Sequence, residues 1–400
     1  MAWALESPAR MQGPPLRIVQ LGATEYRGGG RVVIMSLAGA LSELGHRVML
    51  VGSRGAGSEE LSSSGVTVEE LPWSMSTLGL KPAQALPLLA SAGKFRRLLK
   101  QFRPDIVHVH SRACSLVSML AGRTPEFFTL HNSTFTHKTN ALDIGPLRRL
   151  LSPMGRRVFA LDEIAAGYVR DTLHLPDDRI EIVPNGVNCD RFRPPTAAER
   201  EGARAAFGVS ESETLLLYVG RFVPEKRAVL AVELLAAAKK AGVEGLRLVL
   251  VGAGDLQVEV EARIAALGLQ EQCSVHGWMD PRAAYWAGDL LVMPSLFEGF
   301  PLVAVESMAC GLPVLRTRAG GHALTSRDGV TGYGTEIDAA EFLKTGVEIL
   351  RKRQSLAGLR DGTRQWAADK LSIRRQAEAT VAAYRRLLAG QPAALATAPA

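Results

Sequence analysis

Residues 294–314 read PSLFEGFPLVAVESMACGLPV and place two carboxylates, Glu298 and Glu306, around a predicted helix start. The apolar run 290–293 just before them predicts a buried strand, and Pro301 has the fixed φ that suits a first helical position. We expect three backbone N–H groups to be unpaired there, those of Gly299, Phe300 and Leu302. With the positive end of the helix dipole behind them, such groups bind anions, typically phosphate.

The two acids also have a simpler interpretation, in which Glu298 is an acid favoured by the helix dipole and Glu306 is a solvated surface group. The residues around Glu306 weigh against it, because they are mostly apolar: Val303, Ala304, Val305, Met308 and Ala309. Such a helix is mostly buried, and an unpaired carboxylate is costly there. Glu306 therefore requires a polar partner, and the two acids can grip different parts of one ligand.

The chain has 400 residues, of which 47% are hydrophobic and 22% charged, and its net charge is +7. This length suits two domains of a folded protein. The basic balance fits nucleotides, phosphates or an anionic membrane surface as partners. Nucleic acid is not indicated, because we find no aromatic-rich basic strand or finger-like motif. The four cysteines follow no metal-ligand spacing, which favours a reducing, cytoplasmic setting.

The composition of both chain ends predicts little folded structure. Residues 1–15 are short of apolar residues and rich in proline, so we expect a flexible leader and not a signal peptide. Residues 390–400, GQPAALATAPA, are of low complexity and predict a disordered tail. No apolar run approaches the roughly 20 residues that cross a bilayer, so any membrane contact would be peripheral, at the inner face of the membrane.

Strand and helix patterns alternate through both halves of the chain. In the first half the predicted strands are LRIVQLG, RVMLVGS, DIVHVHS, FFTLHN and RRVFALD. The second half repeats the pattern from TLLLYVG to DLLVMPS. We therefore predict an α/β protein with two doubly wound parallel sheets. The charged, proline-containing stretch 188–213 predicts a linker, and we set the domains at 16–193 and 194–370.

A basic loop follows the first predicted strand of the second half. Residues 220–226 read GRFVPEK, in which Arg221 can fork onto two phosphate oxygens and Lys226 adds a point charge. The alternative is that these two basic residues lie on the surface and form ion pairs with Glu225. Ligands of open α/β sheets bind at the carboxyl ends of the strands. Because this loop and the one before Pro301 both follow strands of one domain, we favour a shared ligand site.

Glycines separate the first predicted strand from the first helix. Gly28, Gly29 and Gly30 would let backbone N–H groups approach a ligand. They lack the G-x-G-x-x-G spacing of dinucleotide-binding proteins, as does the later Gly252-Ala253-Gly254. An enzyme that uses a nicotinamide cofactor is therefore disfavoured.

Three histidines lie near strand ends in the first half: His108 and His110 in DIVHVHS and His131 in FFTLHN. Strand alternation puts His108 and His110 on one face, where they could share a metal, but no third ligand of suitable spacing appears. A core histidine is the better interpretation of His108, and His131 is the better candidate for contact with substrate. We predict no metal site, and the chain has no Asp-x-Asp sequence.

Residues 94–103, KFRRLLKQFR, form a predicted basic amphipathic helix with Phe95, Leu98, Leu99 and Phe102 on one face. Such spacing occurs in helices that lie on membranes. The favoured interpretation is an ordinary helix that covers the sheet and has a solvated basic face. A second basic patch, LRRLL from Leu147, does not decide between the two.

Together these residues resemble the GT-B glycosyltransferases of family 4, retaining enzymes that use nucleotide-diphosphate sugars. The resemblance covers most of the chain, from about Leu16 to the last helix. The family's Glu-x7-Glu element matches Glu298 to Glu306, its G-R-x4-K loop matches residues 220–226 and its glycine loop matches residues 28–30. Two further segments are similar to the family's interdomain segment and to the glycines near its donor: EIVPNGVNCDRFRP and Ala319-Gly320-Gly321.

The resemblance implies a role for each matched residue. Arg221 and Lys226 would bind the donor diphosphate, and Glu306 would hold the ribose. Glu298 would contact the transferred sugar beside the backbone of residues 299–302, and His131 matches the family's histidine near the reacting sugar. We also assign the glycine loop to donor binding.

The chain departs from the family pattern at two points. Arg227 stands where glycine often follows the lysine, and His322-Ala323 replaces a common Pro-Glu pair. Family members send the last helix back onto the first domain, which implies that role for residues 371–389.

The expected fold is therefore the GT-B architecture, two Rossmann-like domains facing a central cleft. The expected activity is metal-independent, retaining transfer of a hexosyl or N-acetylhexosaminyl group from a nucleotide-diphosphate sugar to an acceptor hydroxyl, without a cofactor. The predicted catalytic residues are His131, Glu298, Arg221 and Lys226, with Glu298 as a sugar clamp in preference to a covalent nucleophile.

The acceptor is either a small molecule or lipid-linked. A nucleotide-sugar epimerase and a phosphorylase are the alternatives on the same fold. A different class of function is a non-catalytic nucleotide-sugar-binding partner of another enzyme.

Overall fold

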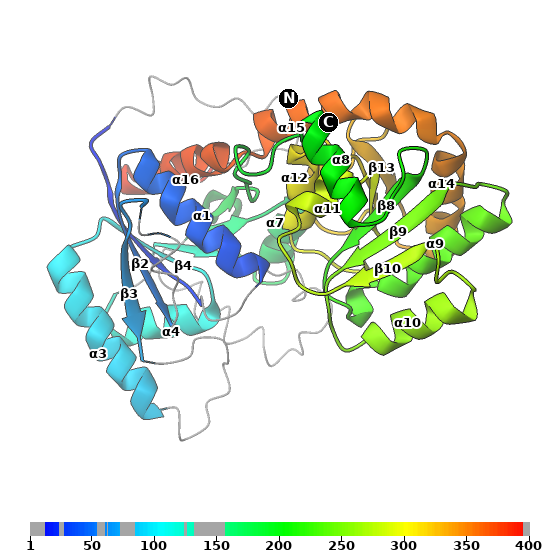
Figure 1. The fold of residues 1–400 in the computed structure, drawn as a ribbon. Coiled ribbons are helices and arrows are strands. Elements are labelled where there is room, and N and C mark those ends of the chain that lie inside the picture. The colour runs from blue at the N-terminus through cyan, green and yellow to red at the C-terminus, as the bar shows by residue number, and fades with distance from the viewer. Residues whose placement is uncertain are drawn as a thin grey trace. The chain divides into compact units, whose positions relative to one another are not determined.

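The computed structural model describes residues 13–23, 28–53, 61, 63–72, 85–123, 126–131 and 157–394. The chain divides into two compact α/β units, Met1–Gly186 with Ile373–Ala400, and Val187–Ser372 (Figure 1). The division falls ahead of the expected boundary at 193, because the N–H of Val187 donates to the carbonyl of Leu371 at 2.8 Å, within the second unit. Most of the expected leader, the basic patch from Leu147 and residues 395–400 lie outside the described residues.

The first unit is built on one parallel sheet. Its strands are β1 (Arg17–Leu21), β2 (Arg47–Ser53), β3 (Thr67–Leu71), β4 (Ile106–Val109), β5 (Phe127–Thr129), β6 (Arg157–Ala160) and β7 (Ile180–Ile182). Its helices within the described residues are α1 (Gly29–Glu43), α3 (Ala85–Phe102), α4 (Arg112–Leu120), α7 (Glu163–Asp171), the 3-10 turn η3 (Asp177–Arg179) and α16 (Ile373–Leu388). The strand order β3-β2-β1-β4-β5-β6-β7 reverses direction between β1 and β4, as in doubly wound folds.

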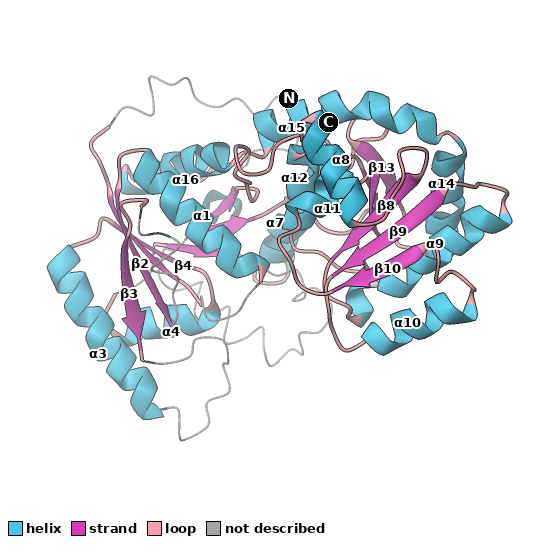
Figure 2. Cartoon of the chain, viewed as in Figure 1, coloured by secondary structure: helices cyan, strands magenta, loops and turns pink. Residues whose placement is uncertain are grey.

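Apolar side chains cover both faces of this sheet, as parallel strands require. Figure 2 distinguishes the strands of the sheet from the helices that lie beside them. Helices α3, α4 and α7 contribute to the core on one face, and α1 and α16 to the core on the other. Helix α16 packs along α1 and buries Tyr384 against the sheet. The last helix therefore belongs to the first unit, although the whole second unit precedes it in the chain.

Helix α3 uses its apolar face to cover the sheet. Phe95, Leu98 and Phe102 are buried in the core, and Leu99 packs against it. The apolar face that could have met a membrane is therefore already occupied by protein. Among the helices that the structure describes, none has the length and hydropathy to cross a bilayer.

The chain after α16 is hydrogen-bonded to the first unit for several residues. Glu181 is buried, and its carboxylate pairs with Arg157 at 3.0 Å and with Arg386 at 2.7 Å. The N–H of Ala394 donates to the same carboxylate, and the Arg157 guanidinium donates to the carbonyl of Gln391. The predicted start of the disordered tail at 390 is therefore too early, since residues 391–394 complete this buried network.

The second unit is also built on one parallel sheet. Its strands are β8 (Thr214–Val219), β9 (Leu246–Val251), β10 (Cys273–His276), β11 (Leu290–Met293), β12 (Val314–Thr317) and β13 (Gly332–Thr335). Its helices are α8 (Ala197–Ala206), α9 (Ala228–Lys240), α10 (Gln257–Ala266), α11 (Arg282–Ala287), α12 (Leu302–Ala309), α13 (His322–Thr325), α14 (Ala339–Arg351) and α15 (Arg360–Lys370), with 3-10 turns η4 (Pro224–Lys226) and η5 (Arg353–Leu359). The strand order is β10-β9-β8-β11-β12-β13.

The sequences of three strands do not predict β-structure. β3 reads TVEEL, β12 reads VLRT and β13 reads GYGT, so each mixes polar residues or glycine into a short run. Pairing with a neighbouring strand makes these segments strands. β12 and β13, for example, align over four residue pairs, from Val314 with Gly332 to Thr317 with Thr335. Local propensity is a weak guide where the sheet supplies the missing contacts.

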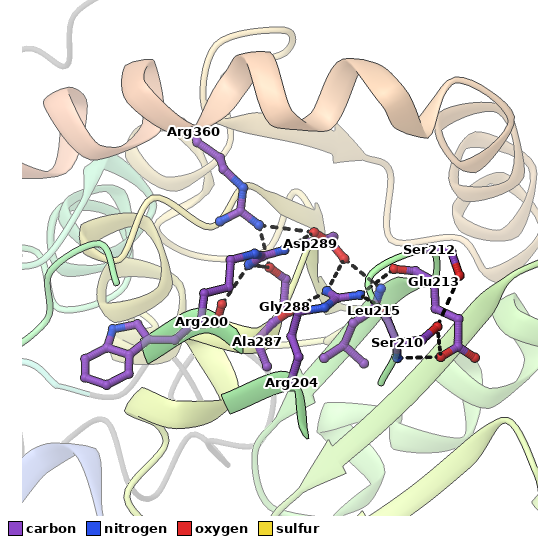
Figure 3. A network of polar contacts seen from close by, with 11 residues as sticks. Arg200, Arg204, Ser210, Ser212, Glu213, Leu215, Ala287, Gly288, Asp289 and Arg360 are labelled. Carbon is purple, nitrogen blue, oxygen red and sulfur yellow. Dashed lines mark hydrogen bonds and ion pairs between the residues drawn. The ribbon is translucent and has the colours of Figure 1, made fainter. Parts of the chain in front are cut away.

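One carboxylate fastens three separate elements of the second unit (Figure 3). Asp289, at the start of β11, accepts hydrogen bonds from Arg200 at 2.6 Å, Arg204 at 3.1 Å and Arg360 at 3.2 Å. Its second oxygen also accepts the N–H of Leu215, at 2.9 Å. The arginines come from α8 and α15, so this single group fixes both helices against the β8–β11 pair.

Asp289→Asn should lower the free energy of unfolding of the second unit by on the order of 3 kcal/mol, because three partly buried guanidinium groups lose their shared anion. Equilibrium urea unfolding measures the loss. The control is Asp177→Asn, which removes an exposed pair with Arg170 and should leave stability almost unchanged. Equal losses in the two variants would contradict the anchoring role of Asp289.

Candidate functional site

Four loops lie at one edge of the second sheet, because they follow parallel strands: β8, β9, β11 and β12. β8 and β11 are neighbours at the point where the strand order reverses. That point is the usual ligand position of an open α/β sheet. Arg221, Lys226 and Glu298 lie in these loops, and Glu306 lies in the helix that follows the β11 loop.

A buried ion pair joins the β8 loop to the β11 loop. Glu298 is 7% exposed, and one carboxylate oxygen accepts a hydrogen bond from Lys226 Nζ at 2.6 Å. The other oxygen accepts one from the hydroxyl of Ser295 at 2.7 Å. The N–H of Leu296 also donates to the carbonyl of Glu225, at 2.8 Å. Two residues that the resemblance assigns to different parts of a donor are thus hydrogen-bonded to each other.

Helix α12 begins one residue later than predicted. Pro301 is its N-cap, with an extended ψ of 109°, and Leu302 is its first residue. Within this helix no side chain caps the N-terminus, and the first turn carries no acid. Phe300 is buried beside it, whereas Gly299 and Leu302 are partly exposed. The first-turn N–H groups therefore have no side-chain cap, which suits an anion at this end of the helix.

Glu306 is buried on α12 and has a neutral partner. It is 9% exposed, and one carboxylate oxygen accepts a hydrogen bond from the hydroxyl of Tyr285 at 2.8 Å. Burial raises the pKa of Glu306 to about 7, and the Tyr285 hydrogen bond opposes this shift in part. The solvated interpretation of Glu306 is therefore wrong, and Tyr285 is the polar partner that the apolar helix required.

Arg221 is the most accessible of the predicted site residues in the β8 loop. Its side chain is 59% exposed and lies 3.8 Å from the carboxylate of Glu225, the surface pair considered as an alternative. An exposed pair of this length contributes little to stability, so Arg221 can leave it for a ligand at small cost. The backbone of Arg221 is held in place, because its carbonyl accepts the hydroxyl of the buried Tyr218 at 3.1 Å.

Arg227, directly after Lys226, adopts a left-handed backbone with φ of 51°. This conformation costs a non-glycine residue on the order of 1 kcal/mol. The turn that ends the β8 loop therefore favours glycine, the residue that often follows the lysine in the family pattern. In this chain the position is occupied by Arg227. Arg227 adopts the same left-handed turn, at the cost in backbone energy given above.

Three glycines let these loops pack closely. A side chain at Gly252 or Gly254 would overlap the carbonyl oxygens of Gly220 and Phe222, so the β9 loop braces the β8 loop from behind. A side chain at Gly320 would overlap the carbonyl oxygen of Glu298. Gly252-Ala253-Gly254, which lacks a dinucleotide-binding spacing, thus has a packing role.

The three predicted histidines of the first unit form one group. His108 is buried, and its ring nitrogens are 2.7 Å from the hydroxyl of Tyr384 and 2.6 Å from that of Thr129. His110 Nδ1 lies 2.9 Å from His131 Nε2. Burial lowers the pKa of His131 to about 4 and those of His108 and His110 well below their usual range. All three rings are therefore neutral near pH 7.

The glycine loop lies at the start of α1. Gly28 is the extended N-cap of α1, and a side chain at Gly28 or Gly30 would meet no atom of the described residues within 4 Å. Packing against the described residues thus does not require glycine at 28 or 30, and residues 24–27 before them lie outside the described part of the chain. Among the residues that the structure describes, no three His, Cys, Asp or Glu side chains gather closely enough to hold a metal ion.

The structure therefore gathers Arg221, Lys226, Glu298 and Glu306 in the second unit, and His131 and the glycine loop belong to the first unit. Sequence reasoning missed Tyr285 and Ser295, which hold the two acids. Ser295 stands three residues before Glu298, a spacing at which a hydroxyl can reach a carboxylate within one turn. No local signal identifies Tyr285, because it reaches Glu306 from a different helix.

Glu306→Gln should change how stability depends on pH. The folded state binds the Glu306 proton more tightly than the unfolded state, whose pKa is near 4.5. The stability that this group contributes is therefore present below pH 4.5 and lost as the pH rises through about 7. We expect Glu306→Gln to match the wild type near pH 5 and to exceed it by on the order of 2–3 kcal/mol at pH 8.

Urea unfolding at several pH values measures this difference. Tyr285→Phe is the companion variant, because it deletes the hydrogen bond that opposes the shift and should move the transition to higher pH. Parallel pH profiles of wild type and Glu306→Gln would contradict the raised pKa.

Two family profiles match the chain, one in each half. The profile described as "Glycosyltransferase Family 4" matches residues 27–191, and the one described as "Glycosyl transferases group 1" matches residues 199–365. A D-inositol 3-phosphate glycosyltransferase of Geodermatophilus obscurus is 32% identical over 306 residues, which are 70% of this chain and 66% of the relative. The chain spans 56% to 66% of the length of the curated relatives that it matches.

Solved structures share the fold at low sequence identity. The HepE protein of Anabaena, determined in complex with UDP and glucose, has a TM-score of 0.77 at 18% identity, with 94% of this chain and 100% of that chain covered. A glycosyltransferase of Rickettsia africae has a TM-score of 0.75 at 22% identity, with 93% and 98% covered. Both similarities concern the whole architecture.

Proposed function

The chain belongs to the GT-B glycosyltransferases of family 4, and we propose that it transfers a sugar from a nucleotide-diphosphate donor to an acceptor hydroxyl. The observation that carries the proposal is the meeting of Lys226, Glu298 and the uncapped start of α12 at one sheet edge. These groups match a ligand with a diphosphate and a hydroxyl-rich part. The complex of HepE with UDP and glucose supports a nucleotide-diphosphate sugar as donor, and we propose a hexosyl or N-acetylhexosaminyl group as the sugar that is transferred.

We assign donor binding to groups in the second unit. Arg221, Lys226 and the first N–H groups of α12 would take the diphosphate, and the Glu306 carboxylate would accept hydrogen bonds from the ribose. Departure of the nucleotide diphosphate leaves negative charge on its oxygens. Two cations and a helix N-terminus stabilise that charge without metal, which is our reason to propose a metal-independent reaction.

Glu298 serves in this proposal as a clamp on the transferred sugar. Both of its oxygens already accept hydrogen bonds, from Lys226 and from Ser295, and such bonds lower the nucleophilicity of a carboxylate. This supports the clamp over a covalent nucleophile. We propose transfer with retained anomeric configuration, on the family resemblance.

His131 and the glycine loop Gly28–30 keep the roles that the resemblance implies. A neutral His131 ring would exchange hydrogen bonds with the sugar and would not act as a cation, since its pKa is about 4. These assignments, like the acceptor class, rest on the resemblance.

Donor binding should raise the melting temperature of the purified protein by mass action. At about 100 times the dissociation constant, a ligand stabilises the folded state by about 2.7 kcal/mol, which is a shift of several degrees. Thermal-shift measurements with UDP-glucose and UDP-N-acetylglucosamine test this, with and without EDTA. We expect the same shift in both. The absence of any shift with nucleotide sugars would contradict the proposal, and a shift lost in EDTA would contradict metal independence.

Arg221→Ala should reduce transfer at least about tenfold and leave folding intact, because the side chain is exposed and its ion pair is weak. Sugar transfer to acceptor is the readout, and proton NMR of the product gives the anomeric configuration. Arg263→Ala is the matched control, an exposed arginine of the same unit paired with Glu233 at 2.8 Å. Normal transfer by Arg221→Ala would overturn the assignment.

A further inference from the structure

Arg316, on strand β12, is the largest side chain that the described structure buries completely. Its guanidinium donates from Nε to the carbonyl of Thr317 at 3.0 Å, and from one terminal nitrogen to the hydroxyl of Thr325. The other terminal nitrogen donates to the carbonyls of Ala319 and Gly320, at 3.0 and 2.7 Å. One side chain thus gathers the acceptors of the turn that leaves β12.

That turn lies directly against the loop that carries Glu298. A side chain at Gly320 would overlap the carbonyl of Glu298 and lie 2.8 Å from that of Gly299. One at Gly321, whose φ is 75°, would lie 2.9 Å from Pro301. Because the backbones touch here, any movement of the turn moves the loop before α12.

A chain of hydrogen bonds leads from the same strand to the Glu298 carboxylate. The hydroxyl of Thr317 donates to the carbonyl of Ser295 at 2.5 Å. The hydroxyl of Ser295 donates to Glu298, which is paired with Lys226. The end of β12 therefore contacts the Glu298 loop twice, through the backbone at Gly320 and through the Thr317 hydroxyl.

We propose that Arg316 is a positioning residue for the donor site. It holds the turn 318–321 in the conformation that packs against Glu298 and the start of α12. The inference rests on the function proposed above. Arg316 acts through the turn and through the β11 loop. Its role is to keep the acid, and the uncapped N–H groups beside it, in one fixed arrangement.

The geometry explains why arginine stands there. Four acceptors lie around the group, and three separate nitrogens of one rigid fork reach them. A lysine has a single nitrogen and cannot satisfy acceptors that lie on different sides. An apolar residue would cover the sheet at less desolvation cost, yet it would release the turn. A guanidinium at this position therefore contributes orientation in addition to packing.

The test compares Arg316→Lys with Thr325→Val. Arg316→Lys keeps the charge and removes the fork, and we expect kcat to fall about tenfold or more with a smaller change in KM for donor, because misplaced groups cost most in the transition state. Thr325→Val deletes one acceptor of Arg316 and the bond from Thr325 to the carbonyl of Gly321, at 2.8 Å, with little change of volume. It should show the same split to a smaller degree. Thr325→Ser restores the hydroxyl and should restore kcat.

Thr331→Val is the matched control. Thr331 is equally buried in the same unit, and its hydroxyl accepts the N–H of Arg327 at 2.8 Å. The control should lose stability without a change in kcat. Unfolding midpoints of all variants separate effects on folding from effects on turnover. If Arg316→Lys does not fold, the kcat of Thr325→Val tests the positioning role by itself.

Two outcomes separate this inference from the proposed function. If the wild type neither binds nucleotide sugars nor transfers them, the proposed function fails. If the wild type is active and Thr325→Val has the kcat of Thr331→Val, with no recovery in Thr325→Ser, the positioning role of Arg316 is overturned while the function stands.

Discussion

A carboxylate taken out of water must be paired, and Glu298 meets this requirement by joining two loops. Its partner Lys226 comes from the β8 loop and its second hydrogen bond from Ser295. Removing one member of such a buried pair leaves the other uncompensated, which typically costs several kcal/mol. The β8 and β11 loops are therefore fixed relative to each other before any ligand arrives. Lys226 is the last residue of η4 and Glu298 stands four residues before the start of α12, so the pair ties the β8 loop to the entry of that helix.

The two acids of the Glu-x7-Glu element differ in their partners, and so in their chemistry. Glu298 is compensated by a cation at hydrogen-bond distance, whereas the hydrogen bond of Glu306 comes from the neutral hydroxyl of Tyr285. Burial raises the pKa of Glu306 to about 7, and the Tyr285 hydrogen bond and the charge of Arg191 oppose this rise only in part. A ligand that offers hydroxyl donors would favour the ionised form of Glu306, so its binding and the loss of a proton are coupled. The two acids of one sequence element thus have different surroundings, a cation beside Glu298 and a mostly apolar helix around Glu306.

Much of this organisation is readable from the sequence, for physical reasons. The buried strands are apolar runs, and the glycine and proline positions mark their loops, so the doubly wound class and the motif residues follow. Strands β12 and β13 do not, because VLRT and GYGT become strands only through their pairing with each other and with β11. Tyr285 and Arg316 were unpredictable for a similar reason: their partners are distant in the sequence or lie in backbone carbonyls, which leave no trace in residue type. The start of the tail was misjudged because the contacts of residues 391–394 come from backbone groups, which add to the side-chain pairs of Glu181 and Arg157 and leave no trace in residue type.

The position of α16 in the chain has a consequence for how the protein is made. The sheet face that it covers contains Ile106, Phe127 and Phe159, all synthesised long before residues 373–388. A ribosome releases the complete second unit before it supplies the helix that closes the first. During that interval the part of this apolar sheet face that α16 covers lacks its helix, and exposed apolar surface of this kind promotes aggregation and is bound by chaperones. The half of the protein that begins first is thus the last to be finished.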